Sequence, residues 1–194
     1  MRIATVERKT NETEIFVNLN LDGTGNFDAD MPIGFFEHML VQISKHGFFD
    51  LYVKATGDTC VDTHHTIEDV GIVLGQALTK AVGDKKGIRR YGSSMVPMDD
   101  VLALCALDLS GRPYLHFEAD FTVPKLGDMD TELVKEFFQA ICVHGGMNLH
   151  IKILHGTNNH HISEAIFKAF GRALCEAVSL DSRIDGVLST KGSI

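Results

Sequence analysis

The sequence predicts an α+β fold, in the form of an α/β sandwich made of two tandem duplicated halves, residues 1–90 and 91–194. The first reason is that the motif His-His-x-x-Glu occurs at residues 64–68 and again 96 residues later, at 160–164. The second reason is that the expected strands and helices follow the same order in both halves. Each half is therefore expected to form a small, mostly antiparallel sheet with two helices packed on one face.

The match between the halves extends beyond the motif, because Gly75 and Leu78 correspond to Gly171 and Leu174 at the same offset. A repeated apolar stripe by itself would show no more than that two helices pack in the same way. Adjacent histidines followed by a glutamate are costly to bury without a partner, so their duplication indicates a metal site. The alternative is that each histidine pair merely caps its helix.

The first half should contain three strands and two helices. Residues 2–8 and 14–22 are rich in alternating apolar and β-branched side chains, which predicts two strands, and glycines 23 and 25 supply the following turn. Residues 35–45 carry apolar side chains at helical spacing. Residues 48–55 are expected to form a strand, and residues 66–82 a long helix with the metal motif at its first turn.

The second half should follow a joint formed by the polar, glycine-bounded residues 83–87 and the segment 88–92. Residues 101–109 and 114–121 are expected to form a hairpin around Ser110-Gly111-Arg112-Pro113. A helix over about 131–143, a strand over 148–154 and a helix over about 162–178 complete this half. The polar tail, residues 182–194, is either frayed or a flap over a site.

The composition limits the possible partners. The chain has 194 residues and a formal net charge of −8, and its basic residues are scattered apart from one cluster at 85–90, which argues against nucleic acid or an anionic membrane. The four cysteines never form Cys-x-x-Cys, which fits free thiols in a reducing compartment. With no signal peptide and no run of 18 apolar residues, we expect a soluble, cytoplasmic protein.

The spacing of the motif suits two metal ions. On a helix, the first histidine and the glutamate are four residues apart and share a face, whereas the second histidine is rotated by about 100°. Imidazole and carboxylate ligands suit manganese, iron, nickel or zinc, and the lack of cysteine ligands argues against structural zinc. The order is neither His-Glu-x-x-His nor His-x-x-Glu-His, so a zinc protease has little support.

Further polar residues extend the candidate site. His38 begins the helix before the strand that leads to the first motif, with Gln42 and His46 on the same face at i+4 and i+8. A shift of 98 residues places Glu136 at the equivalent position, so His38 and Glu136 would each complete a ligand set. Other cations and hydroxyls offer an anion clamp: Arg90, Arg112, Lys168, Ser189 and Lys191.

Together these segments resemble the imidazoleglycerol-phosphate dehydratase family, over residues from about 2 to 192. The segments that carry the resemblance are Arg8-Lys-Thr-Asn-Glu12-Thr13, Phe36-Glu-His38-Met-Leu40, Asp62-Thr-His64-His65-Thr-Ile-Glu68-Asp69, Arg89-Arg90-Tyr91-Gly92, Asp108-Leu-Ser-Gly-Arg112-Pro113, His160-His161-Ile-Ser-Glu164-Ala-Ile-Phe-Lys168-Ala and Ser189-Thr-Lys191-Gly192. The resemblance implies two related α/β halves in each chain. It also implies particles of 24 subunits with active sites at the subunit interfaces.

The resemblance further implies a site with two Mn²⁺ ions, whose ligands would be His38, His64, His65, Glu68, Glu136, His160, His161 and Glu164. Some family members carry histidine where this chain has Glu136, and both side chains bind manganese. Catalytic roles would fall to Glu12, Glu68 and Glu164. The residues that would contact the substrate are Glu12, His38, Gln42, His46, Arg90, Arg112, Lys168, Ser189 and Lys191.

The implied reaction removes water from imidazoleglycerol phosphate, a small phosphorylated imidazole, and gives imidazole-acetol phosphate in histidine biosynthesis. A substrate imidazolate bound to two manganese ions and a diazafulvene-like intermediate are implied with it. Two other functions compete, a binuclear metallohydrolase acting on phosphate esters and a metal-buffering or metal-assembled scaffold. Aspartates usually dominate metallohydrolase sites, and a scaffold has no need for Glu12, Arg90, Arg112 or residues 189–191. The sequence therefore favours the dehydratase.

Overall fold

The computed structural model describes residues 1–194 and divides them into two successive groups of strands and helices. The first group is β1 (Ile3–Lys9), β2 (Thr13–Asn20), β3 (Phe27–Asp30), α1 (Gly34–Gly47), β4 (Asp50–Gly57) and α2 (His64–Val82). The second group is β5 (Tyr91–Met98), β6 (Val101–Asp108), β7 (Tyr114–Glu118), β8 (Lys125–Leu126), β9 (Met129–Asp130), α3 (Leu133–Gly145), β10 (Asn148–His155) and α4 (Asn159–Val178).

The two groups share one sheet topology. The strand orders are β1-β2-β4-β3 and β5-β6-β10-β7, and in each sheet only the last pair is parallel. The register also repeats, because Tyr91 pairs with Asp108 as Ile3 pairs with Asn20, 88 residues earlier. The predicted α+β class, with duplicated halves and mostly antiparallel sheets, is confirmed.

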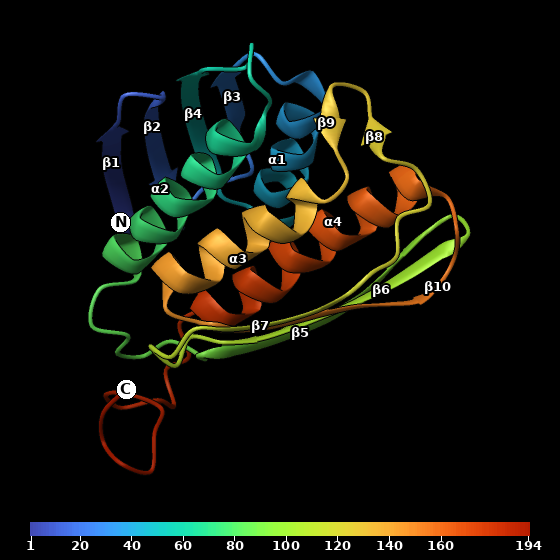
Figure 1. Ribbon diagram of the computed structural model, residues 1–194. Helices are drawn as coiled ribbons and strands as arrows, with labels where there is room; N and C mark the ends of the chain where they lie inside the picture. The colour runs from blue at the N-terminus through green and yellow to red at the C-terminus, as the bar shows by residue number, and fades with distance from the viewer.

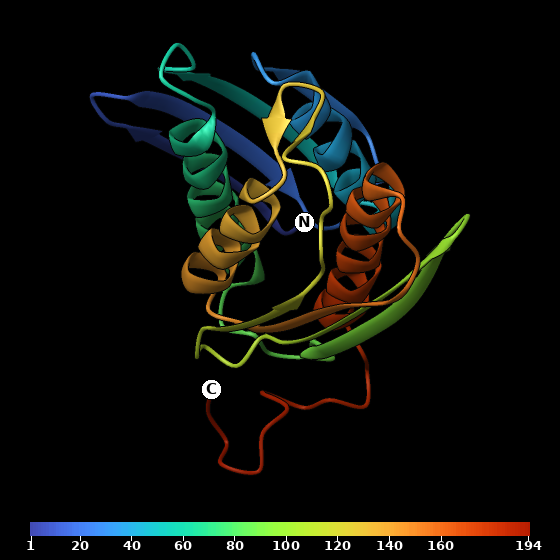
Figure 2. The same ribbon diagram turned by 45° about the vertical axis from the view of Figure 1, so that its right-hand side comes forward.

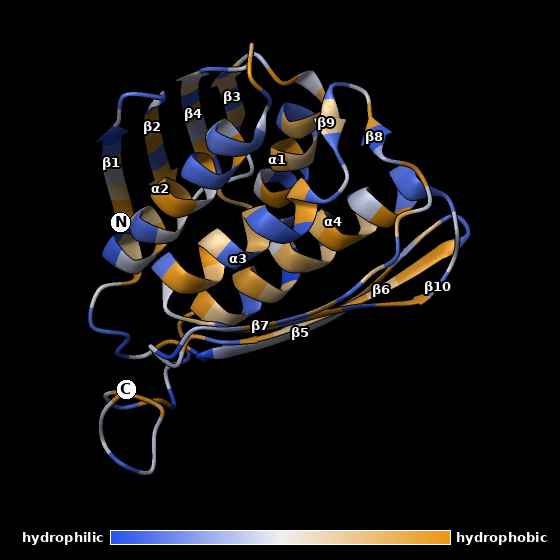
Figure 3. Ribbon diagram, in the orientation of Figure 1, coloured by the Kyte–Doolittle hydropathy of each residue, from blue (hydrophilic) through white to orange (hydrophobic).

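The four helices lie between the two sheets (Figure 1, Figure 2). Helix α2 covers β1 and β2, helix α4 covers β5 and β6, and across the middle α1 packs on α4 while α2 packs on α3. The apolar side chains of both sheets and all four helices form one continuous core, visible as orange ribbon in Figure 3. None of the helices is both long and apolar enough to cross a lipid bilayer.

Two repeated glycines set the distance between the helices. A Cβ on Gly75 of α2 would lie 2.9 Å from the backbone nitrogen of Gly145 on α3, and a Cβ on Gly171 of α4 would lie 2.8 Å from the carbonyl oxygen of Ile43 on α1. Any larger residue at these positions would push the helices apart. The duplicated glycines therefore bring α1 to the motif helix α4 and α3 to the motif helix α2.

The expected hairpin of residues 101–109 and 114–121 is wrong in its pairing. Strand β6 pairs with β5 and β10, whereas β7 pairs in parallel with β10, and β10 lies between them. Strand β7 also ends at Glu118, earlier than expected. The chain between β6 and β7 is short, but it passes across the end of β10 and does not form a hairpin turn.

Other differences concern boundaries and short strands. Strands β3, β5, β8 and β9 were not expected, and β5 begins at Tyr91, inside the segment 88–92 that was expected to belong to the joint. Helix α2 begins at His64 and α4 at Asn159, a few residues before the expected starts. Both histidines of each motif therefore lie inside the first turn of a helix.

Candidate functional site

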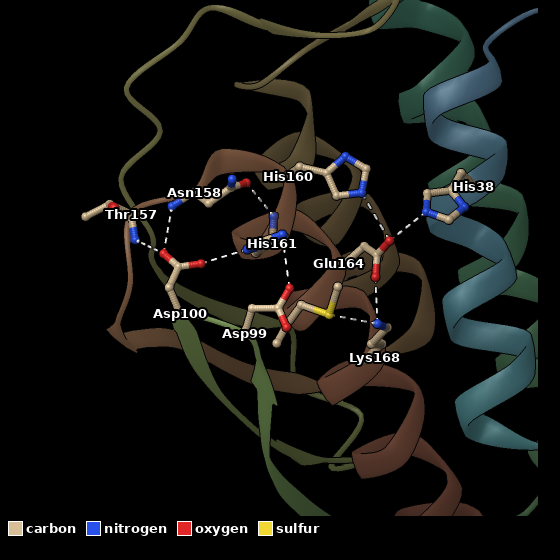
Figure 4. Close-up of polar contacts among 10 residues, drawn as sticks. His38, Asp99, Asp100, Thr157, Asn158, His160, His161, Glu164 and Lys168 are labelled. Carbon is tan, nitrogen blue, oxygen red and sulfur yellow. Dashed lines mark hydrogen bonds and ion pairs between the residues drawn. The ribbon is translucent and has the colours of Figure 1, made fainter.

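Three side chains that are far apart in the sequence converge where α4 packs against α1 (Figure 4). Glu164 Oε1 lies 2.7 Å from His38 Nε2 and 3.1 Å from His160 Nε2. These three donor atoms all lie within 4.8 Å of one another. His160 and Glu164 share a face of α4, as their spacing predicts. The structure thus joins a helix of the first half to the motif of the second half.

Glu164 is kept ionised in this cluster. Its residue is 6% exposed. Burial alone would raise its pKa, but hydrogen bonds from Lys168, at 2.6 Å, and from His38 and His160 outweigh that effect and lower the pKa to about 2. The carboxylate therefore carries a negative charge at neutral pH, beside two half-exposed imidazoles. Such a set of donors can accept a divalent cation.

The corresponding residues of the first motif are less concentrated. His64 and Glu68 lie in the first two turns of α2, and Glu136 lies in the first turn of α3, which packs on α2. This is the arrangement of α4 and α1 repeated in the other helix pair. The donor atoms of His64, Glu68 and Glu136 do not all lie within 4.8 Å of one another, in contrast to those of the His38 cluster.

The second histidine of each motif points away from the first and is held by acidic residues. His161 Nδ1 lies 2.7 Å from Asp100 Oδ1, and its Nε2 lies 3.4 Å from Asp99 (Figure 4). His65 Nδ1 lies 3.1 Å from Asp58, and the hydrogen bond with Asp58 raises the pKa of His65. Each ring is thereby oriented by a hydrogen bond at its Nδ1.

Glu12 lies in the turn between β1 and β2 and joins the neighbourhood of His65. Its Oε2 is 3.8 Å from His65 Nδ1, and its donor atom forms a second cluster of possible metal ligands with Asp58 and His65. Asp100 occupies the same place in the repeat as Glu12, since each directly precedes the first residue of the sheet's second strand. The two carboxylates differ in their contacts, because Asp100 forms a hydrogen bond with His161 and Glu12 forms none with His65.

Most of the predicted anion clamp lies elsewhere in the chain. An open cavity of about 760 Å³ is lined by Arg90, Arg112, Ser189 and Lys191, and also by Arg183. Arg90 forms a two-point pair with Asp108, at 2.6 and 3.0 Å, and donates a third hydrogen bond to the carbonyl of the tail residue Leu188. The tail is thus attached to the body of the protein at this cavity. Lys168 is absent from this group because it pairs with Glu164.

The cavity and the His38 cluster lie at opposite ends of α4. The backbone nitrogen of Arg90 donates to the carbonyl of Ala177, in the last turn of α4, whereas His160 lies in the first turn. At the rise of an α-helix these positions are roughly 25 Å apart. Figure 1 shows the C-terminal tail on the far side of the lower sheet from the N-terminal end of α4. One small molecule therefore cannot contact both sites of the same chain.

Gln42 and His46 extend from the cluster along α1. Gln42 is buried, and its side chain donates to the carbonyl of His38 in its own helix. His46 is half-buried, two turns beyond His38. Burial, together with the positive charges of Lys168 and Arg172, lowers the pKa of His46. A neutral imidazole and an amide thus line this side of the helix pair.

Four residues that surround these groups were not predicted from the sequence: Asp58, Asp99, Asp100 and Arg183. Asp100 could have been found, because the repeat places it opposite Glu12. Asp58 and Asp99 lie in loops, and no sequence spacing distinguishes these two aspartates from the other acidic residues of loops. Arg183 belongs to the tail, where no periodic pattern exists.

The comparisons with known proteins agree with the residues gathered here. The family model for imidazoleglycerol-phosphate dehydratase matches residues 31–174, which contain His38, Glu136 and both motifs. The chain belongs to this family. Within the imidazoleglycerol-phosphate dehydratases, a relative from Lachnoclostridium phytofermentans is 61% identical over 193 residues, which cover 100% of this chain and 98% of that one. A relative from Acetivibrio thermocellus is 60% identical over 189 residues, 97% of each chain.

Solved structures of the family have the same fold. The imidazoleglycerol-phosphate dehydratase of Staphylococcus aureus aligns with a TM-score of 0.82 at 39% identity, over 92% of this chain and 99% of that one. The enzyme of Pyrococcus furiosus aligns with a TM-score of 0.85 at 34% identity, over 97% of this chain and 100% of that one. This family member is therefore an enzyme, a dehydratase of the lyase class.

Proposed function

We propose that this chain removes water from imidazoleglycerol phosphate and forms imidazole-acetol phosphate, a step of histidine biosynthesis. The observation that carries the proposal is the match over the full chain to relatives that bear the dehydratase name. The convergence of His38, His160 and Glu164 supports it, because the reaction has to activate an imidazole ring without a redox cofactor. We place the enzyme in the cytoplasm, since its four cysteines are free.

The donor set fits two Mn²⁺ ions, because manganese accepts both imidazole nitrogen and carboxylate oxygen. One ion would be held by His38, His160 and Glu164. The second would be held by the repeat-related residues of the α2–α3 pair, His64, Glu68 and Glu136. The outward-pointing second histidine of each motif, His65 or His161, would complete a site of a neighbouring subunit. When bound, the ions lower the pKa of the substrate's ring N–H, so the ring can supply electrons for loss of the adjacent hydroxyl.

The protein's own carboxylates would move the protons. Glu12 is our candidate general acid/base, because 57% of its side chain is exposed and its Oε2 stands 3.8 Å from the nearest nitrogen of His65, beyond hydrogen-bond length. It would take the carbon-bound proton next to the departing hydroxyl, which leaves an enol that becomes the ketone. Glu68 and Glu164 would share the remaining transfers, and Lys168 would keep Glu164 ionised.

The substrate phosphate would be bound by the cations of the tail cavity. Arg90, Arg112 and Lys191 supply positive charge, and Ser189 supplies a hydroxyl. Since this cavity lies roughly 25 Å from the His38 cluster along α4, one active site must combine the cluster of one subunit with the cavity of another. Closed assemblies of identical subunits satisfy this requirement, and the 24-subunit particle is the form we propose. Within each subunit, we assign residues 1–90 and 91–194 to the two repeat halves.

Chelation and reconstitution test the function. Protein stripped with a chelator should form no imidazole-acetol phosphate, and added Mn²⁺ should restore both turnover and the large particle on the same samples. A variant that keeps the metal ligands but removes a phosphate contact, Lys191→Ala, should assemble with Mn²⁺ yet turn over slowly. If metal restored assembly but never turnover, the scaffold function would be supported. If Lys191→Ala were fully active, the tail cavity would not bind the phosphate.

A further inference from the structure

A buried polar cluster lies directly behind the turn that carries Glu12. Asp69 follows Glu68 on α2 and is 6% exposed. Its Oδ1 accepts a hydrogen bond of 3.0 Å from Arg8 Nε on β1, and its Oδ2 accepts one from the hydroxyl of Thr13, the first residue of β2. The carboxylate therefore ties both strands that flank the turn to the motif helix.

The turn is itself closed by the hydroxyl of Thr10. The backbone nitrogens of Glu12 and Thr13 donate to Thr10 Oγ1 at 3.1 and 3.0 Å, and the hydroxyls of Thr10 and Thr13 lie 3.2 Å apart. The backbone of Glu12 is thus linked through Thr10 and Thr13 to Asp69. The Glu12 side chain, in contrast, is more than half exposed, and its carboxylate stands 3.8 Å from His65 Nδ1.

The repeat shows that the fold does not require polar residues here. The strand registers and the motif offset place Val96, Val101 and Ala165 where the first half has Arg8, Thr13 and Asp69. These three are 8%, 1% and 0% exposed, so the second half fills the same space with apolar groups. Burying a charged carboxylate costs free energy that apolar packing avoids. The first half therefore keeps its cluster for a reason other than folding.

The reason follows from how each turn is held. In the second half the turn carboxylate itself holds the turn to α4, because Asp100 accepts from the backbone nitrogens of Thr157 and Asn158 and bonds His161. That carboxylate is fully engaged. In the first half Asp69 on α2 holds the turn through its hydrogen bonds with Arg8 and Thr13. The carboxylate of Glu12 is therefore free to contact a substrate.

We propose that Asp69 is a positioning residue for the dehydration, which acts by holding the Glu12 turn against the metal-binding end of α2. The proposal rests on the proposed function, in which Glu12 transfers protons at the substrate carbon. Asp69 touches neither substrate nor metal in this role. Its effect reaches the reaction only through the position of Glu12, and a displacement of about 1 Å in such a group can lower turnover about 100-fold.

A double-mutant cycle tests the proposal on the Mn²⁺-loaded assembled enzyme. Asp69→Asn should lower kcat by about 10- to 100-fold with a smaller change in KM, because the misplaced group acts in the transition state. In a Glu12→Gln background, Asp69→Asn should lower kcat no further. If the two losses multiplied, or if Glu12→Gln alone were fully active, Asp69 would not act through Glu12 and the proposal would be overturned.

Two further variants separate positioning from folding. The triple variant Arg8→Val, Thr13→Val, Asp69→Ala transfers the apolar set of the second half, so it should fold and assemble but show the same loss of kcat. Full activity of this variant would overturn the proposal. Asp50→Asn is the matched control, because Asp50 holds another turn through the backbone nitrogens of Thr24 and Asn26 and should leave kcat unchanged.

Hydrogen exchange provides a measurement that is independent of activity. In Asp69→Asn the amides of Thr10, Glu12 and Thr13 should exchange about 10-fold faster, while those of the α2 interior keep their protection. Unchanged exchange in the turn would overturn the proposal. A wild-type enzyme that formed no imidazole-acetol phosphate would instead refute the proposed function, and the exchange of these amides would still decide whether Asp69 holds the turn.

Discussion

His46 lies on the shared face of α1 and α4, two helical turns beyond His38. Its surroundings disfavour the protonated ring, because burial removes water and Lys168 and Arg172 on α4 place positive charges nearby. Glu164 acts in the opposite direction but more weakly, so the pKa of His46 is lowered. The imidazole is therefore neutral at pH values where an exposed histidine would be partly charged.

This lowered pKa predicts a contribution to stability that depends on pH. Between the lowered folded value and the unfolded value of about 6.5, the unfolded chain binds more protons at His46, so the free energy of unfolding falls on acidification. The contribution is complete above the unfolded pKa and is lost as the pH falls through the folded one. His46→Gln should therefore lessen the loss of stability that sets in as the pH falls below about 6.5. Urea unfolding of chelator-treated protein checks this, and identical pH slopes for the two proteins would contradict it.

Helix α1 depends on the other half of the chain at its first turn. The residue before it, Ile33, has no side-chain acceptor, and the backbone nitrogens of Gly34 and Phe35 donate instead to the two oxygens of Asp128, at 2.7 and 3.1 Å. Asp128 lies in the turn between β8 and β9. Figure 1 shows this short hairpin beside α1. A carboxylate there also complements the helix dipole. The short hairpin thus fixes the helix that carries His38.

Removal of this cap should destabilise the protein measurably. Asp128→Ala leaves two helix N–H groups without their acceptor, and we expect the free energy of unfolding to fall by about 1 kcal/mol. The control is Asp130→Asn in the same hairpin, which only loosens a partly exposed pair with Lys125 at 3.4 Å and should cost less than about half as much. Equal effects of the two substitutions in denaturant titrations would show that Asp128 acts through charge alone and not as a cap.

The strands that the sequence missed are short or contain residues typical of turns. Strand β5 contains Gly92, Ser93, Ser94 and Pro97, residues typical of turns, and it is stable because it lies at a sheet edge, where proline is tolerated. Strand β3 has only four residues, two of them aspartates. Strand β3 pairs in parallel with β4, as β7 does with β10. Recognition of β3 and its pairing would therefore have placed β7 beside β10 through the repeat, which excludes the hairpin.

The long helices and central strands were predictable, because their apolar periodicity agrees with their burial. The repeated motif also predicted His160 and Glu164, which the structure brings together with His38. The sequence could not show that α1 packs on α4, which brings His38 to Glu164 and not to the motif of its own half. It could not show the hydrogen bonds of Asp100 and Asp69 either, because these connect loops and strands that are 56 to 61 residues apart from their partners.

At the scale of the whole molecule, the repeat places chemically different groups at the two ends of the helix layer. The N-terminal end of α4 has the His38 cluster, and its C-terminal end adjoins the cations of the tail cavity. Neither end suffices for a phosphorylated imidazole. Under the proposed function, the outward-pointing His65 and His161 have the same consequence, since each would complete a metal site of a neighbouring subunit.

Mixing two inactive variants tests whether sites are shared between subunits. His160→Ala should abolish metal binding at the cluster, and Lys191→Ala should weaken phosphate binding at the cavity, so each assembly alone should be nearly inactive. If the two groups of a site come from different chains, particles formed from equal amounts of both, dissociated with chelator and reassembled with Mn²⁺, should regain about one quarter of wild-type activity by random pairing. Mixing the assembled particles without dissociation is the control and should regain none. If both groups of a site came from one chain, every site would contain one of the two substitutions. Activity that stayed at the level of the separate variants after reassembly would therefore contradict shared sites.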